Sequence, residues 1–99
     1  MVTIQFALNK ENIKKAGYTV ASVEKYLRDF YAERHANEIA YLTFQRDDEH
    51  AMCDLGRIGR VMRKDPLFLS FLTKCVWNVD GEVENCLTAI KIYIAKHDR

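Results

Sequence analysis

The sequence has few of the residues that interrupt secondary structure or build linkers. It contains one proline and four glycines in 99 residues, and no Pro/Gly/Ser-rich stretch, repeat or low-complexity segment divides it. Its 48% hydrophobic residues are enough for one packed core. We therefore expect residues 1–99 to form a single domain.

The sequence also lacks an excess of charge of either sign. Fifteen Lys and Arg residues oppose fourteen Asp and Glu residues, for a net charge of +1. The net charge therefore gives the protein no overall electrostatic attraction to a nucleic acid or an anionic membrane. No apolar run approaches the roughly 18 residues of a membrane span, and residues 1–6 are not a cationic leader. We expect a cytoplasmic protein with no membrane association.

Cysteine is scarce, and its spacing fits neither a disulfide framework nor a compact metal site. Cys53, Cys75 and Cys86 are odd in number, which is typical of free thiols in a reducing compartment. His50 could join them as a fourth tetrahedral ligand, but the long separations match no known zinc spacing. We expect no metal and no other cofactor, although these four residues remain an open alternative.

Motifs of catalysis are missing as well. His35, His50 and His97 have no neighbouring nucleophile, and no glycine-rich phosphate loop follows a predicted strand. The acidic residues 47–49 are explained by a helix start, where negative charge is favourable. The sequence therefore predicts a protein that is not an enzyme.

What the sequence does have is clear hydrophobic periodicity. Residues 2–8 alternate between apolar and more polar side chains, which predicts a strand. Asn9 can cap a short helix that ends at Gly17, and Thr19 can cap a longer amphipathic helix over residues 20–36. The β-branched and aromatic residues of 39–44 predict a second strand.

The second half of the chain reads as helical. The acidic residues 47–49 predict a helix start, and Asp65 followed by Pro66 predicts a cap and first turn for a short helix over 66–72. Asp80 and Gly81 could turn a hairpin, but apolar residues from Val83 to Ile94 keep helical spacing, which favours a final helix. The predicted fold is α+β: a small two-stranded sheet with about four helices, in the order β-α-α-β-α-α-α.

Residues 55–62, LGRIGRVM, resemble the core of the KH family of RNA-binding domains. In that family a glycine-x-x-glycine loop joins two helices, and its backbone approaches nucleic-acid phosphates. Periodicity instead favours one continuous helix over 48–64, because apolar residues share one face across both glycines: Ala51, Leu55, Ile58 and Met62. The glycines then mark the close approach of a neighbouring element.

The opposite face of this predicted helix carries the candidate site. We call it the basic stripe, and it consists of Arg57, Arg60, Arg63 and Lys64. Such a run of charge is commonly only a solvated face. Four cations in eight residues without an intervening acid can also contact phosphate or an acidic protein surface.

The first third of the chain is similar to the ribbon-helix-helix DNA-binding proteins. Its predicted order is strand, short helix, a turn at Gly17 and a longer helix. The resemblance implies that paired strands from two copies enter the major groove, with Thr3, Gln5 and Ala7 pointing outward. None of these three side chains is cationic. The alternative function is therefore nucleic-acid binding, through this strand-helix-helix segment or through the basic helix 48–64.

By elimination, the sequence predicts a non-enzymatic interaction protein, a regulator or inhibitor that contacts a protein or nucleoprotein partner through the basic stripe. Small domains of this kind are common among phage and mobile-element proteins that act on host machinery. Aromatic residues, 11% of the chain, are typical of protein interfaces. A two-stranded sheet would also leave edges that a second copy could pair with, as in a homodimer.

Overall fold

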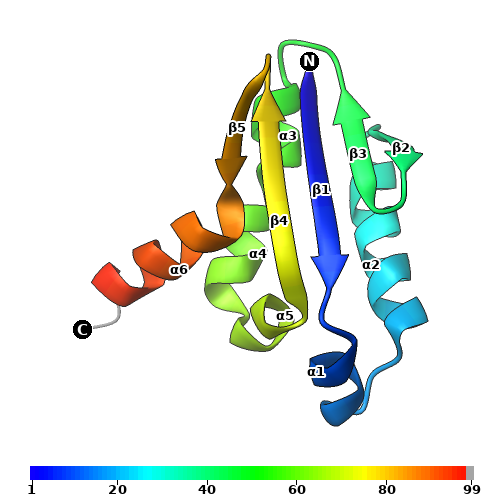
Figure 1. The fold of residues 1–99 in the computed structure, drawn as a ribbon. Helices are drawn as coiled ribbons and strands as arrows, with labels where there is room; N and C mark the ends of the chain where they lie inside the picture. The colour runs from blue at the N-terminus through cyan, green and yellow to red at the C-terminus, as the bar shows by residue number, and fades with distance from the viewer. Residues whose placement is uncertain (98–99) are drawn as a thin grey trace.

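A five-stranded antiparallel sheet is the framework of the protein in the computed structural model, which describes residues 1–97 (Figure 1). The strands lie in the order β2-β3-β1-β4-β5. In chain order the elements are β1 (Val2–Leu8), α1 (Lys10–Lys15), α2 (Val20–Glu33), β2 (Asn37–Ala40), β3 (Thr43–Arg46), α3 (Ala51–Leu55), α4 (Ile58–Lys64), α5 (Pro66–Ser70), β4 (Leu72–Val79), β5 (Glu82–Asn85) and α6 (Cys86–His97). Helices α2, α3 and α4 lie against one face of the sheet (Figure 1).

Strand β1 forms the centre of the sheet and divides its two faces. Val2, Ile4 and Phe6 are buried beneath the helices, whereas Gln5 is exposed on the opposite face. The alternation predicted for residues 2–8 is confirmed, because successive side chains of a strand point to opposite faces. The core is completed by side chains from α2, from α3 and α4, and from β3 and β4.

The structure is α+β, but the predicted two-stranded sheet and the order β-α-α-β-α-α-α are wrong. The observed order is β-α-α-β-β-α-α-α-β-β-α. The difference comes from two hairpins, β2–β3 and β4–β5, and from the division of the predicted helix 48–64 into α3 and α4. With five strands present, the argument that a second copy completes the sheet no longer applies.

The first hairpin replaces the predicted strand 39–44. Strands β2 and β3 are joined at Tyr41 and Leu42, and Leu42 has a positive φ of 46°. The carboxylate of Glu38 accepts a hydrogen bond from the backbone N–H of Leu42, at 3.0 Å, and so supports the turn. No glycine, asparagine or aspartate marks this turn, so the usual sequence signal is missing.

In the second hairpin, β4 lies mostly where no element was predicted, and β5 replaces the start of the predicted final helix. Asp80 and Gly81 have φ values of 52° and 91°, the two positive values of the two-residue turn that suits hairpins. The apolar residues with helical spacing belong to a helix only from Cys86 onward, where α6 begins. Val83, which extended the helical pattern, is a strand residue with 67% of its surface exposed.

The predicted starts of α1, α2 and α5 are confirmed. The side chains of Asn9, Thr19 and Asp65 each accept a backbone N–H bond from the first turn of a helix. Pro66 is the first residue of α5, and Gly17 has a φ of 85° just after α1. Among residues 1–97, no helix combines the length and the apolar character needed to cross a bilayer.

Candidate binding groove

The segment predicted as one helix over 48–64 is instead two short helices, α3 and α4. Between them, Gly59 and Arg60 donate their N–H groups to the carbonyls three residues earlier, at Gly56 and Arg57, both at 3.1 Å. These tighter bonds interrupt the α-helical ladder and bend the segment. A Cβ atom on Gly56 would lie 2.9 Å from the carbonyl oxygen of Met52 and 3.5 Å from the ring of Trp77, so glycine lets the bend pack against β4.

The bend does not disrupt the apolar face predicted for this segment. The apolar face is confirmed, because its four members are all buried: Ala51, Leu55, Ile58 and Met62. The hydroxyl of Tyr31 on α2 donates a hydrogen bond to the carbonyl of Leu55, at 3.1 Å, and burial raises the pKa of Tyr31 well above its usual value. This bond holds the end of α3 against α2, immediately before the bend.

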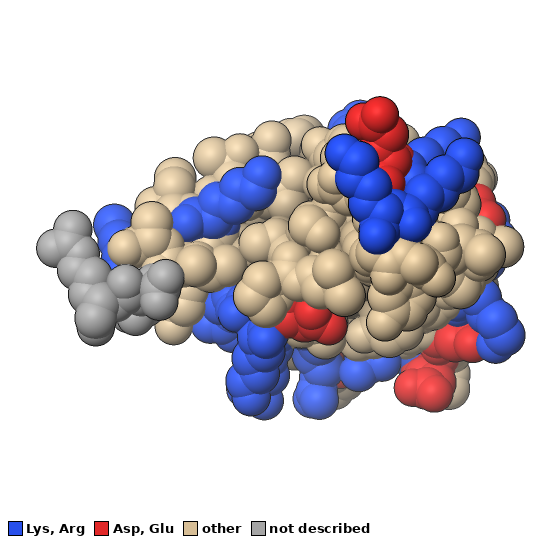
Figure 2. Space-filling model, turned by 90° about the horizontal axis from the view of Figure 1, so that it is seen from below, with Lys and Arg blue, Asp and Glu red and all other residues tan. Residues whose placement is uncertain are grey.

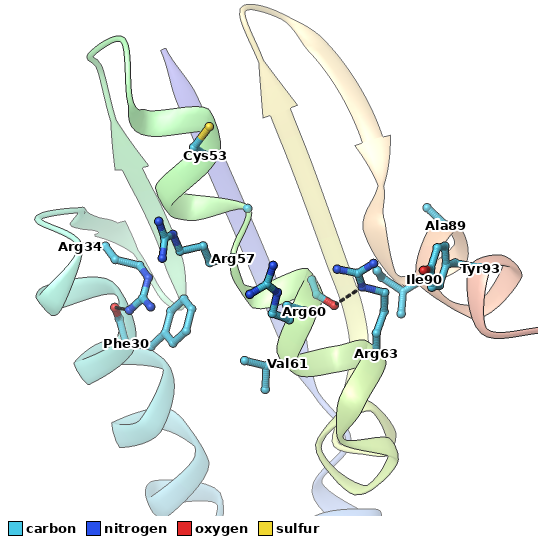
Figure 3. A pocket seen from close by; sticks show the side chains of 12 residues that line it. Phe30, Arg34, Cys53, Arg57, Arg60, Val61, Arg63, Ala89, Ile90 and Tyr93 are labelled. Atoms are coloured by element: carbon cyan, nitrogen blue, oxygen red, sulfur yellow. Dashed lines mark hydrogen bonds between the residues drawn. The ribbon is translucent and has the colours of Figure 1, made fainter. Parts of the chain in front are cut away.

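A groove of about 780 Å³ lies between α2, the α3–α4 segment and α6 (Figure 3). Arg57, Arg60 and Arg63 of the basic stripe line it, together with Arg34 from the end of α2, whereas Lys64 does not. We call this feature the arginine groove. In Figure 3 the four arginine side chains follow one another across it, from Arg34 to Arg63. The other lining residues are Phe30, Cys53, Gly56, Gly59, Val61, Ala89, Ile90 and Tyr93.

Arg34 is held firmly at one end of the groove. Its Nη1 donates a hydrogen bond to the carbonyl of Phe30, at 2.9 Å, and its guanidinium lies 3.6 Å from the centre of the Phe30 ring. Among the described residues, its buried Nε atom has no hydrogen-bond partner. A cation stacked on an aromatic face is both attracted and oriented by the ring.

The arginines of the basic stripe make few contacts with acidic side chains. Arg63 donates from Nε to the carbonyl of Gly59, at 3.4 Å, and its guanidinium lies 4.9 Å from the Tyr93 ring centre. Arg57 has a long ion pair with Asp54, at 3.8 Å. Arg60 has no ion pair within residues 1–97.

Two carboxylates lie beside the groove arginines: Glu33, which is exposed and 3.9 Å from Nη1 of Arg34, and Asp54, which is largely engaged elsewhere. Nη1 of Arg46 donates to the Asp54 carboxylate at 2.6 Å and to the carbonyl of Arg34 at 2.9 Å, and Nε of Arg46 donates to Asp48 at 2.6 Å. These hydrogen bonds, first to Asp48 and then to Asp54, raise the pKa of Arg46. No Asp or Glu within residues 1–97 lines the arginine groove, so four positive charges share a lining without an anion.

The residues of the alternative metal site do not gather around one point. Cys53 is exposed on α3, whereas Cys75 is buried in β4. In the part of the chain that the structure describes, no three His, Cys, Asp or Glu side chains are placed to hold a metal ion. The groove therefore offers guanidinium groups and apolar surface, an arrangement that can bind carboxylates or phosphates.

The sequence interpretation missed Arg34 and the aromatic side chains of the groove. Phe30 and Arg34 stand four residues apart, a spacing that places a cation beside a ring on one helix face. That signal indicates a local pair, but not which other helix lies beside it. That this pair lines one groove with residues of α4 and α6 follows from tertiary packing alone.

The predicted ribbon-helix-helix contact is wrong in its pairing. Strand β1 lies between β3 and β4 and is hydrogen-bonded on both edges, so it cannot pair with β1 of a second copy. Thr3, Gln5 and Ala7 instead belong to the sheet face away from α2, α3 and α4. The chain matches no protein family, no curated protein and no solved structure in the comparisons.

Proposed function

We propose that the protein is a non-enzymatic regulator or inhibitor that binds an acidic segment of a protein partner in the arginine groove. The observation that carries this proposal is the set of four arginines, supplied by two separate parts of the chain, around a groove without a lining carboxylate. Arginine forms two parallel hydrogen bonds with a carboxylate and is therefore well suited to recognise Asp and Glu side chains. Binding of the acidic segment in the arginine groove would prevent other proteins from contacting that segment.

The mixed character of the lining supports a protein partner over a nucleic acid. Phe30, Val61, Ile90 and Tyr93 place apolar surface between the arginines, as at the centre of protein interfaces. Nucleic-acid strands use aromatic faces for base stacking. One face of Phe30 and one face of Tyr93 are already covered by the guanidinium groups of Arg34 and Arg63.

The charge distribution on one end of the molecule supports the same choice. On the end of the molecule seen in Figure 2, Lys and Arg form separate groups with uncharged surface between them, and acidic side chains stand beside some groups. A duplex or a long single strand is bound by positive charge that follows its phosphates over a distance. A short acidic segment needs only the local charge of one groove.

The test is a comparison of two triple variants with equal loss of charge. Arg57, Arg60 and Arg63 are changed to alanine in one variant, and Lys10, Lys14 and Lys15 in the other. The three lysines belong to α1, are exposed and lie outside the groove. Each tagged protein is used to capture binding proteins from nuclease-treated lysate of the organism that makes it, with quantification by mass spectrometry. The affinity of any captured partner is then measured with purified components.

We expect a partner with an acidic segment to bind the unchanged protein and the lysine variant equally. The arginine variant should lose at least about a hundredfold in affinity, because each charge-assisted hydrogen bond contributes about 1.5–3 kcal/mol. Equal binding by all three proteins would contradict the proposed site. Retention of nucleic acid alone, with affinity that falls steeply with salt, would support the nucleic-acid alternative through the basic stripe.

A further inference from the structure

The β4–β5 hairpin brings two cysteines to its open end. Its register pairs Val76 with Asn85 and Trp77 with Glu84, and the next residues on the two chains are Cys75 of β4 and Cys86, the first residue of α6. Directly opposed residues of antiparallel strands have Cα atoms about 4.5–5.5 Å apart. A disulfide spans Cα separations of about 4.4–6.8 Å, a range that includes the separation expected for residues that continue this register.

The two thiols have different environments. Cys75 has none of its surface exposed, whereas Cys86 is half-buried and is the first residue of α6. The hydrogen bond between them, followed by burial, raises the pKa of Cys75, and the same hydrogen bond lowers the pKa of Cys86. The positive end of the α6 dipole acts in the same direction on Cys86, while the charge of Glu84 opposes it.

We propose that Cys86 and Cys75 are an oxidation site at which a hydroperoxide converts the two thiols into a disulfide. The accessible Cys86 thiolate attacks the peroxide O–O bond, which yields a sulfenic acid on Cys86 and releases water or an alcohol. The Cys75 sulfur then attacks the Cys86 sulfur, the S–O bond breaks, and the hydroxyl group leaves with the Cys75 proton as water. In total the cysteine pair loses two electrons and two protons, which reduce one peroxide to water and to water or an alcohol.

This site is separate from the arginine groove, because neither Cys75 nor Cys86 lines it. The disulfide would join β4 to the first residue of α6, the helix that carries Ile90 and Tyr93 into the groove. Cys53, exposed on α3, has no cysteine partner and provides an internal comparison. Accessible thiolates beside a second cysteine are the usual targets of reversible oxidation.

The experiment treats the full chain with hydrogen peroxide for increasing times and then blocks the remaining thiols with iodoacetamide under denaturing conditions. No Lys or Arg lies between Cys75 and Lys91, so trypsin releases both cysteines in the peptide 75–91 and Cys53 in the peptide 47–57. Cleavage after Glu82 or Glu84 then separates Cys75 from Cys86 unless a disulfide joins them. Mass spectrometry follows both tryptic peptides in the same digest.

We expect peptide 75–91 to lose two hydrogen atoms and to become resistant to alkylation. The rate of this change should be about ten times the rate at which Cys53 is oxidised. In Cys75→Ser the Cys86 sulfenic acid should persist and be trapped by dimedone, and in Cys86→Ser the remaining Cys75 should stay reduced. Because the main measurement uses the unchanged protein, it holds even if Cys75→Ser fails to fold. Equal oxidation rates for Cys86 and Cys53, or Cys86 joined only to a second chain, would overturn the proposal.

Discussion

At the level of single residues, the two glycines of the α3–α4 segment contribute in different ways. A Cβ on Gly56 would lie 2.9 Å from the Met52 carbonyl oxygen, whereas one on Gly59 would lie 3.7 Å from Cδ1 of Ile90. We expect Gly56→Ala to lower the free energy of unfolding by about 1–3 kcal/mol, because the bend must shift. Gly59→Ala should raise it by up to about 1 kcal/mol through better helix propensity. Urea denaturation of both variants measures the difference.

The glycine pair also tests why the sequence prediction failed here. A continuous helix over 48–64 would make both glycines interior helix positions, and alanine would then stabilise both sites. Stabilisation by Gly56→Ala would therefore contradict the bent structure. The tight contact at Gly56 is with the Met52 carbonyl of its own segment, at 2.9 Å, whereas Trp77 of the neighbouring strand lies at an ordinary contact distance of 3.5 Å. Periodicity could not show that the ladder breaks at this point.

A second comparison concerns arginines that support the structure and arginines that do not. Arg46 bridges Asp48, Asp54 and the Arg34 carbonyl, whereas Arg60 has no ion pair among the described residues. We expect Arg46→Ala to lower the urea midpoint clearly. Arg60→Ala should change the free energy of unfolding by no more than about 0.5 kcal/mol, as for an ordinary surface residue. A large loss with Arg60→Ala would mean that the groove arginines serve stability, contrary to the proposed function.

At the level of elements, an ion pair connects α2 to the first hairpin. Arg28 donates to both carboxylate oxygens of Glu38, at 2.8 and 3.2 Å, and the N–H of Leu42 donates to the same carboxylate. The bond from Arg28 is the main cause that lowers the pKa of Glu38. Because the folded pKa is lower than the unfolded one, the stabilisation is complete above the usual pKa of a glutamate. It is lost as the pH falls through the lowered value.

We therefore expect the unchanged protein to be more stable than Glu38→Gln at pH 7, with the difference shrinking as the pH falls into the acid range. Urea denaturation of both proteins at a series of pH values provides the measurement. Lys25→Met is a suitable control, because it removes the exposed pair with Asp29 within α2 and leaves the hairpin unchanged. A difference between the unchanged protein and Glu38→Gln that does not depend on pH would contradict the assignment.

The hairpins also show how far elements can be predicted from this sequence. The sequence correctly predicted β1, α1, α2 and α5, because these elements depend on local periodicity and on capping side chains. Asp80 and Gly81 carried a strong hairpin signal that was outweighed by apolar spacing running on into α6. The turn at Tyr41 and Leu42 had no comparable signal, since its positive φ is supported by Glu38 and by strand pairing.

At the level of the whole molecule, the arginine groove combines a predictable part with an unpredictable one. The arginines of the basic stripe could be found because helical periodicity places them opposite a buried face. Arg34 could not be assigned to the same site, because its position depends on how α2 packs beside α3 and α4. The hydrogen bond from Tyr31 to the Leu55 carbonyl helps to set that arrangement. This bond could not be predicted, because the two residues lie far apart in the sequence.

The central position of β1 also affects how the chain folds. Every residue of β1 has a partner in β4, from which it is separated in the sequence by helices α1 to α5 and the β2–β3 hairpin. The entropy of closing so long a loop must be offset before this ladder forms, so sheet completion is expected to be slow compared with the local hairpins. Until residues 72–79 arrive, during synthesis or refolding, β1 keeps an unpaired edge beside an apolar face. Such an intermediate attracts strands of other chains, and aggregation during refolding should therefore rise steeply with protein concentration.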